Sequence, residues 1–519
     1  MNIYINITKR IISVLSSLCL FVMCFCMLSC DDKLSELPSQ SKVDGTLVVD
    51  EPSALVALRG FYYSYAMCGE DYNGTKTTKC TKQYEVRPAD FAGTIIYTYG
   101  AYQLETHNPS SLALANAWQS LYTIVNAANC VIKQIDDAPD DVFSGNKKAQ
   151  FLGEARCMRA YANYNVMKYY AYYWDINSPY GIIVRDEPCT VTNLPAKRNS
   201  VKETYDHILA DLDYAIANAP ETNDKCFANK WVAMGLKARV LMMRGQGNDY
   251  AEAASLTKDI IEKGPYTLEE NVIDVFHTKG LNSSEAMFGV QPKSGQVDVY
   301  EGWIMHSYPS DAPQYLVTDN LLALFKDDPR KDKIFHVTQK TSYVFDEAGN
   351  MNIVVSQVYG VNKHLVPGTW AASAIEENQI HMRLTEMYLL RAEALVRQNQ
   401  LDEARRLLKA VLSHAGYTDF SMVDNAQSQH DMLQQVFNEY LRNLFAESGR
   451  EMDIMMRYPK DIVLAFNPAY ADDKFNVFPL PVEEFQYNNM LTHADQNPGY
   501  ESEQKSIPVV RYVSVCVCL

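Results

Sequence analysis

The sequence lacks the short motifs by which many enzymes are recognised. Its 519 residues contain no Gly-x-Ser-x-Gly turn, no His-Glu-x-x-His helix and no glycine-rich phosphate loop. Its 10 histidines show no ligand-like spacing and no Cys-x-x-Cys pair occurs, so no zinc site is expected. Acidic neighbours such as Asp136 and Asp137 do occur. Among 63 acidic residues such neighbours arise by chance, so they do not indicate a glycosidase. The sequence therefore predicts no enzyme activity.

Positive charge is also scarce. There are 47 Lys and Arg residues against 63 Asp and Glu residues, which gives a formal net charge of −16. A negative protein repels phosphate backbones and anionic headgroups, so the balance argues against nucleic acid and against adsorption to an anionic membrane. The net charge says little about binding of uncharged ligands.

The first thirty residues are typical of an export signal with a lipid attachment site. Lys9 and Arg10 are the only charges there, and a mostly apolar run at 11–28 follows, ending on Ser29-Cys30. That ending resembles a bacterial lipobox, in which the signal is cut off before the cysteine and the cysteine carries a diacylglycerol and an acyl chain. An uncleaved membrane-spanning helix is the alternative, because a run of this length just spans a bilayer. The Leu-Ser-Cys-Asp junction favours the lipoprotein.

The chain is expected to have four parts. They are a signal peptide at 1–29, the lipidated Cys30 with a flexible tether at 30–50, one α-rich domain at 51–500, and a tail of unknown role at 501–519. In an exported protein, Cys68 and Cys80 are the favoured disulfide pair.

Amphipathic periodicity predicts a mostly α-helical fold. Two helix pairs stand out, at 384–411 with a break at Asn399-Gln400, and at 231–262 with a turn at 246–248. In the first pair, Ala392 and Ala404 have the spacing of the small residues in a tetratricopeptide repeat. Further helices are expected at 113–136, 149–173, 201–219 and 434–456.

Two regions, 68–110 and 280–380, show no sustained period and are rich in Gly, Pro, Asn, Tyr and Trp. We expect them to be long irregular insertions, with few short strands, laid over a scaffold of tetratricopeptide-like helix pairs. Insertions of this length in a helical scaffold usually carry function.

Several motifs follow one another in an order seen in one family. The chief ones are Glu154-Ala155-Arg156-x2-Arg159-Ala160-Tyr161, Glu386-Met387-Tyr388-Leu389-Leu390-Arg391-Ala392-Glu393-Ala394, Phe478-Pro479-Leu480-Pro481-x2-Glu484 and Gln496-Asn497-Pro498-Gly499-Tyr500. Together they resemble the SusD/RagB nutrient-uptake outer-membrane lipoproteins of Bacteroidota, over nearly the whole mature chain. The resemblance implies a SusD-like fold with a short strand at 179–183.

One family helix appears here with substitutions. Its acidic and basic positions match Glu439, Glu447, Arg450 and Asp453, while Tyr440, Ser448 and Glu451 replace the expected Arg, Gly and Trp. We interpret the retained charges as a structural ion network rather than a binding site.

The resemblance also implies a function. Family members capture a glycan or an oligopeptide without catalysis and deliver it to a SusC-like TonB-dependent transporter barrel, with no cofactor. The acidic residues after Cys30, Asp31 and Asp32, resemble the surface-export signal of Bacteroidota lipoproteins. The expected location is therefore the outer membrane, lipid-anchored and facing the exterior.

A neutral glycan is held by aromatic faces against its C–H surfaces and by hydrogen bonds to its hydroxyls. The two insertions supply such groups, and the predicted ligand contacts are Arg87, Asp90, Tyr97, Tyr99, Tyr102, Trp303, Tyr308 and Trp370. Aromatic residues on helix-periodic positions are expected in the core instead: Trp118, Tyr122, Trp231 and Tyr388.

Three alternatives remain open. One is capture of a basic oligopeptide by the same architecture. Another is a helical-repeat assembly scaffold that faces the periplasm, although long aromatic insertions argue against regular repeats. The third is a lipid-anchored hydrolase.

Overall fold

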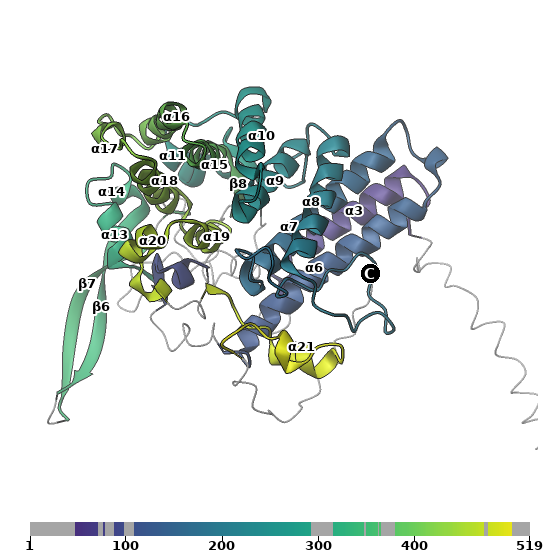
Figure 1. The fold of residues 1–519 in the computed structure, drawn as a ribbon, viewed down its shortest axis with the longest axis horizontal. Helices are drawn as coiled ribbons and strands as arrows, with labels where there is room; N and C mark the ends of the chain where they lie inside the picture. The colour runs from purple at the N-terminus through teal and green to yellow at the C-terminus, as the bar shows by residue number, and fades with distance from the viewer. Residues whose placement is uncertain are drawn as a thin grey trace, which may run out of the picture.

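The structure is a computed structural model that describes residues 47–70, 76–77, 88–97, 108–291, 315–346, 349–361, 363–364, 379–471 and 476–500. These residues form a mostly helical molecule with a few short strands and one long β-hairpin (Figure 1). Among them, no helix combines the length and apolar character needed to cross a bilayer.

The first half of the molecule is a group of long helices. They are α3 (Glu51–Ala66), α6 (Leu112–Asp137), α7 (Lys147–Tyr170) and α8 (Val201–Asn218). Helix α7 packs against the other three and is buried on nearly all sides from Phe151 to Tyr170. Capping boxes fix the starts of α3 and α8, through Asp50 with Ser53 and Ser200 with Glu203.

The two predicted helix pairs are confirmed. They are α9 (Lys230–Arg244) with α10 (Asp249–Lys263), and α15 (Leu384–Arg397) with α16 (Leu401–His414). Ala392 and Ala404 are both buried where α15 packs on α16. Asn399 takes φ +60° in the turn between these two helices. Helix α10 packs on α15, which joins the pairs into one layer.

The single helix predicted at 434–456 is wrong. The structure has α18 (Gln429–Leu444) and α19 (Arg450–Arg457), separated by a break in which Ala446 and Ser448 have positive φ. The break lets Glu447 reach Arg383, at 2.9 Å, and lets the Ala446 N–H donate to the Glu451 carboxylate at 2.6 Å. Ion pairing with distant residues thus overrides local helix propensity.

The strand expected at 179–183 is also wrong. This segment is extended but belongs to no sheet. Its N–H groups are partly satisfied by side chains: Ile182 donates to Thr204 Oγ1 and Ile183 donates to the Tyr122 hydroxyl. Gly181 and Ile182 also exchange backbone hydrogen bonds with Asn199, which satisfies this segment without a regular sheet.

The region 280–380 is less irregular than predicted. Its described part contains β4 (Ala286–Val290), β5 (Tyr315–Val317), β6 (Phe335–Phe345), β7 (Met351–Val361) and β8 (Gln379–Arg383). All pairings are antiparallel, β4 with β8, β6 with β7, and β5 with β3 (Ile95–Tyr97). A further small pair joins β1 (Gly69–Glu70) to β2 (Lys76–Thr77). The β6–β7 hairpin extends away from the helices (Figure 1).

Short helices complete the described fold. They are α11 (Val272–Asp274), α13 (Asp319–Leu324), α14 (Lys331–Ile334), α17 (Ser421–Asp424), α20 (Lys460–Phe466) and α21 (Val482–Tyr487).

Candidate ligand-binding site

Most predicted ligand contacts lie outside the described residues, and so does Cys30. These contacts are Arg87, Tyr99, Tyr102, Trp303, Tyr308 and Trp370. For Tyr97 only the backbone is described, and Asp90 is described in full. The roles given to these residues, and the pairing of Cys68 with Cys80, remain predictions.

The strand pair β3–β5 brings the two insertions together. Ile95 lies opposite Val317, and Tyr97 lies opposite Tyr315. One described stretch ends at Tyr97 and another begins at Tyr315, directly opposite it, so both insertions meet the fold at the same end of this strand pair. Nothing in the sequence of either region indicated that they pair.

A tight turn fixes the start of β3. Gly93 has φ +78°, and a Cβ there would lie 2.8 Å from Asn467 Nδ2, so only glycine fits. Asn467 Nδ2 in turn donates to the Ala92 carbonyl at 2.9 Å. Asp90, just before this turn, is only 6% exposed. Its carboxylate therefore lies below the surface, and a ligand contact by Asp90 stays a prediction.

A cavity of about 350 Å³ opens beside this strand pair, between α13, α18 and α20. Its size is at the lower end of the range for small-molecule sites, about 300–1,000 Å³. We call it the carboxamide pocket; it is lined by Asn320, Ala323, Leu324, Gln434, Asn438, Ile462, Ala465 and Phe466.

Thr318 connects the strand pair to the pocket. It directly follows β5, and its Oγ1 donates to the Gly93 carbonyl at 2.7 Å. The same oxygen accepts the Leu321 N–H and so caps α13, which carries Asn320. Asn320 is five positions after Tyr315, a span of at most about 17 Å of chain.

The polar groups of the pocket are all uncharged. Gln434 Nε2 donates to Asn438 Oδ1 at 2.9 Å, which leaves Gln434 Oε1 and Asn438 Nδ2 for other partners. Asn320 is exposed at the rim, and Phe466 and Ile462 are buried at the apolar side. An arrangement of carboxamides beside apolar surface suits the hydroxyls and C–H faces of a sugar.

Sequence reasoning missed these carboxamides. The i, i+4 spacing of Gln434 and Asn438 on a predicted helix was a signal that both share one helix face. The contribution of Asn320 depends on how α13 packs on α18, which no local pattern shows.

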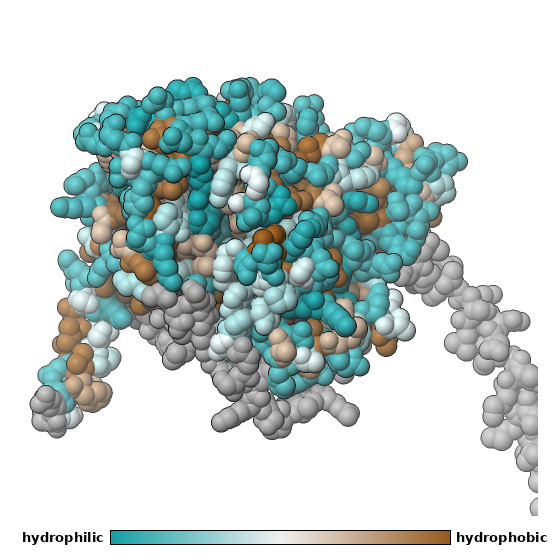
Figure 2. All heavy atoms as spheres, viewed as in Figure 1, coloured by the Kyte–Doolittle hydropathy of each residue, from teal (hydrophilic) through white to brown (hydrophobic). Residues whose placement is uncertain are grey.

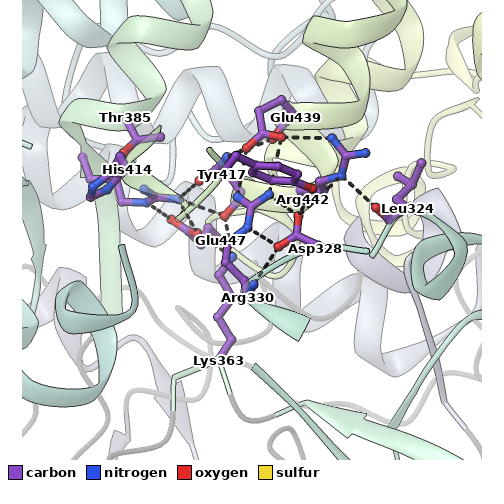
Figure 3. A network of polar contacts seen from close by, with 12 residues as sticks. Leu324, Asp328, Arg330, Lys363, Thr385, His414, Tyr417, Glu439, Arg442 and Glu447 are labelled. Carbon is purple, nitrogen blue, oxygen red and sulfur yellow. Dashed lines mark hydrogen bonds and ion pairs between the residues drawn. The ribbon is translucent and has the colours of Figure 1, made fainter. Parts of the chain in front are cut away.

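A buried ion cluster holds the pocket walls in place (Figure 3). Arg330, which follows α13, bonds both Asp328 at 2.6 Å and Glu439 of α18 at 2.9 Å. Arg442 of α18 donates to the carbonyl of Leu324, a pocket residue, at 2.9 Å. We define the buried ion cluster by its charged residues and His414: Glu285, Asp328, Arg330, Lys363, Arg383, His414, Glu439, Arg442 and Glu447.

The charges of the cluster shift each other's protonation. Burial raises the pKa of Asp328, but hydrogen bonds and charge from Arg330 outweigh this and hold the pKa below its usual value. Burial raises the pKa of Glu285 as well, and His414 and Arg383 bring it down to about 2. Burial lowers the pKa of Lys363 to about 8, even though Glu447 lies 2.5 Å away. At neutral pH these carboxylates are therefore ionised and paired.

A second group of buried charges continues towards α9 and α19. Glu386 bonds Arg239 at 2.5 Å and Arg450 at 2.7 Å. Asp453 pairs with Arg450 and Arg457, and Glu393 pairs with Arg457. The prediction that Glu439, Glu447, Arg450 and Asp453 form a structural ion network is confirmed.

The four aromatic residues predicted to lie in the core are buried or partly buried. Trp118 and Trp231 are buried, and Tyr122 and Tyr388 are partly buried. Tyr164 on α7 accepts a hydrogen bond from Arg450, so even this helix is tied to the buried charges.

Comparison with known proteins agrees with this fold. A family model described as "SusD family" matches residues 299–508, and one described as "Starch-binding associating with outer membrane" matches residues 53–242. A SusD-like protein of Bacteroides ovatus is 30% identical over 186 residues, which is 34% of this chain and 33% of that protein. The alignment thus spans about a third of the relative's length.

Solved structures match over most of the chain. A SusD superfamily protein from Bacteroides thetaiotaomicron has a TM-score of 0.68 at 19% identity, with 87% of this chain and 100% of that chain covered. A laminarin-binding SusD-like protein has a TM-score of 0.67 at 18% identity and the same coverage. At these identities the likeness shows the fold. The chain belongs to the SusD/RagB family.

Proposed function

We propose that this chain captures a glycan without cleaving it. The observation that carries the proposal is the β3–β5 pair, which joins the two aromatic insertions within a few residues of the uncharged carboxamide pocket. In this proposal, aromatic side chains from the insertions hold the sugar rings, and Asn320, Gln434 and Asn438 bond the hydroxyls. The similarity to a laminarin-binding SusD-like protein supports glycan as the ligand class.

The uncharged pocket favours a glycan over a basic peptide. A site for basic peptides needs carboxylates that face the ligand, whereas the buried carboxylates near this pocket, such as Asp328 and Glu439, are already paired with arginines. Basic peptides therefore belong in the test as a competing ligand class.

The test is to titrate the purified full chain with a panel of neutral glycans that includes laminarin, and with basic peptides, while products are followed by chromatography. We expect binding of at least one glycan with no new product. Cleavage of any glycan, or binding of peptides alone, would contradict the proposal.

Variants then locate the site. Trp303→Ala and Tyr97→Ala should each weaken glycan binding by about tenfold, the amount expected for one aromatic contact of 1–1.5 kcal/mol. Tyr63→Ala is the control for a surface tyrosine, because Tyr63 is exposed on α3 and belongs to neither insertion. Equal weakening by Tyr63→Ala would contradict the assignment.

We further propose that lipid on Cys30 anchors the domain at the cell exterior, where it passes the glycan to a SusC-like TonB-dependent barrel. Protease added to intact cells should release the domain, and Cys30→Ala should abolish membrane attachment. Complete protection from protease would instead place the domain on the periplasmic side, and failure to co-purify with any barrel would contradict the delivery step.

A further inference from the structure

The β6–β7 hairpin is the most projecting feature of the described fold (Figure 1). Its register runs from Phe335 opposite Val361 at the base to Phe345 opposite Met351 near the tip. Strands of eleven residues are roughly 35 Å long. Phe335 and Val361 are buried against the body, whereas the distal residues are exposed.

The two faces of the distal hairpin differ. On one face the opposed pairs are Thr341 with Val355, Tyr343 with Ile353, and Phe345 with Met351. On the other face they are Lys340 with Ser356, Ser342 with Val354, and Val344 with Asn352. The first face, which we call the apolar hairpin face, is therefore apolar at five of six positions. Those five side chains are between 56% and 67% exposed, and Figure 2 shows apolar residues gathered along the hairpin.

Such a face is unfavourable in water. Two aromatic side chains of about 150–250 Å² and three smaller aliphatic ones, each somewhat more than half exposed, leave roughly 500 Å² of apolar surface on this face. That is as large as the largest patch on an ordinary monomer, and such patches mark interaction sites. A two-stranded hairpin alone is also marginally stable, so a partner surface would stabilise it.

The apolar hairpin face is complementary to itself. Its pairs go from polar to small to large towards the tip: Gln339 with Gln357, then Thr341 with Val355, Tyr343 with Ile353, and Phe345 with Met351. A two-fold axis at the Tyr343–Ile353 pair would stack two such faces in opposite directions. The large Phe345 and Met351 of one copy would then cover the small Thr341 and Val355 of the other. The polar residues Asp346 and Asn350 near the tip would lie over Gln339 and Gln357.

We propose that this chain self-associates through the apolar hairpin face, with the two-fold axis at Tyr343 and Ile353. Two copies would bury roughly 1,000 Å² in total, which is the lower limit for a specific interface, so the dimer is weak and reversible. A membrane is a poorer occupant of this face. The tip that would enter first carries Asp346 and Asn350, and a buried carboxylate is costly in an apolar medium.

Cysteine cross-linking tests the contact in the full chain in its own membrane. Two copies of a residue on a two-fold axis meet, so Tyr343→Cys should form a covalent dimer under a mild added oxidant, well above the level of the unsubstituted chain. Asn352→Cys is the matched control, because Asn352 is equally part of the exposed hairpin but lies on the opposite face. Equal dimer from both variants, or none from Tyr343→Cys, would overturn the proposal. So would a cross-link from Tyr343→Cys to a different protein.

Sedimentation of the purified full chain in detergent gives a second measurement. We expect a concentration-dependent dimer that Ile353→Lys weakens at least tenfold. Val344→Lys, on the opposite face of the same hairpin, should leave it unchanged. Glycan binding should be equal in both variants, so failure of the dimer and failure of glycan capture are separable. A monomer at every concentration would overturn the proposal.

Discussion

Helix α18 carries two polar faces that are used in different ways. Glu439 lies in the buried ion cluster, bonded to Arg330 and to Arg442 of its own helix. Its neighbour Asn438 lines the carboxamide pocket with Gln434, one turn earlier. The charged face is saturated by protein partners, whereas the carboxamide face keeps hydrogen-bonding capacity for something outside the chain. Charge in this fold is therefore a structural device, and neutral polarity marks the candidate site.

The two faces are connected. Arg442 bonds the carbonyl of Leu324, and Arg330 ties the segment after α13 to α18. The buried ion cluster thus sets the distance between α13 and α18, and with it the width of the carboxamide pocket. Loss of cluster charges should affect both stability and binding, whereas loss of a pocket carboxamide should affect binding alone.

The largest effect is expected from Glu439→Ala. Removing this carboxylate leaves buried Arg330 and Arg442 with less compensation, which costs about 3–5 kcal/mol. Asn438→Ala is the matched control on the adjacent residue and should cost no more than about 1 kcal/mol. Denaturant unfolding measures both. Similar losses of unfolding free energy for the two variants would contradict the idea that only the charged face of α18 stabilises the fold.

Acid should act on the buried ion cluster and not on the uncharged carboxamides of the pocket. Glu285, beside Arg383 and His414, has its pKa lowered from 4.5 to about 2 in the fold. As the pH falls, the Glu285 carboxylate is therefore protonated in the unfolded chain before it is protonated in the folded one. Its contribution to the free energy of unfolding is fully present above pH 4.5 and is lost as the pH drops towards 2. Glu285→Gln should remove at most about 3 kcal/mol of this pH dependence. Stability followed from pH 6 to 2 checks it, and an unchanged slope in the variant would contradict the assignment.

The fold was predictable from the sequence where its causes are local. The helix pairs α9–α10 and α15–α16 follow from periodicity and from turn residues such as Asn399. The break after α18 was not predictable, because Glu447 leaves the helix to meet Arg383 and Lys363, which are distant in sequence. The β6–β7 hairpin was missed because adjacent apolar residues, Val344 and Phe345, hide the alternation of its faces.

The site was predictable only in outline. Composition predicts that residues 68–110 and 280–380 supply ligand contacts, and this role stays a prediction. Their meeting at Tyr97 and Tyr315 depends on a strand pairing between remote segments, which no single segment encodes. Asn320 joins the pocket only because Thr318 caps α13 and bonds Gly93.

A smaller effect, on binding alone, is expected at the pocket rim. Asn320→Ala removes one carboxamide that has no role in the buried ion cluster, and a hydrogen bond to a ligand contributes about 1 kcal/mol. Glycan affinity should fall about fivefold while the unfolding midpoint stays within error. Leu194→Ala, at a half-exposed site that does not line the pocket, is a control that should change neither value. A loss of stability without a loss of glycan affinity would show that Asn320 supports the fold rather than the ligand.

The smallest expected change in the free energy of unfolding is at an exposed ion pair. Comparing it with a buried pair tests whether charge or burial makes an ion pair important for stability. Helix α8 carries the acidic partner of two ion pairs. Asp211 pairs with Arg159 of α7 and is buried, whereas Asp206 pairs with Lys202, and these two side chains are 52% and 69% exposed. Water already solvates the exposed pair, so Asp206→Asn should change the free energy of unfolding by less than about 0.5 kcal/mol. Asp211→Asn, five residues further along the same helix, should cost several times more, because Arg159 would lose its buried carboxylate. If both variants cost the same, charge rather than burial would set the energy, and the contrast between the two faces of α18 would need another explanation.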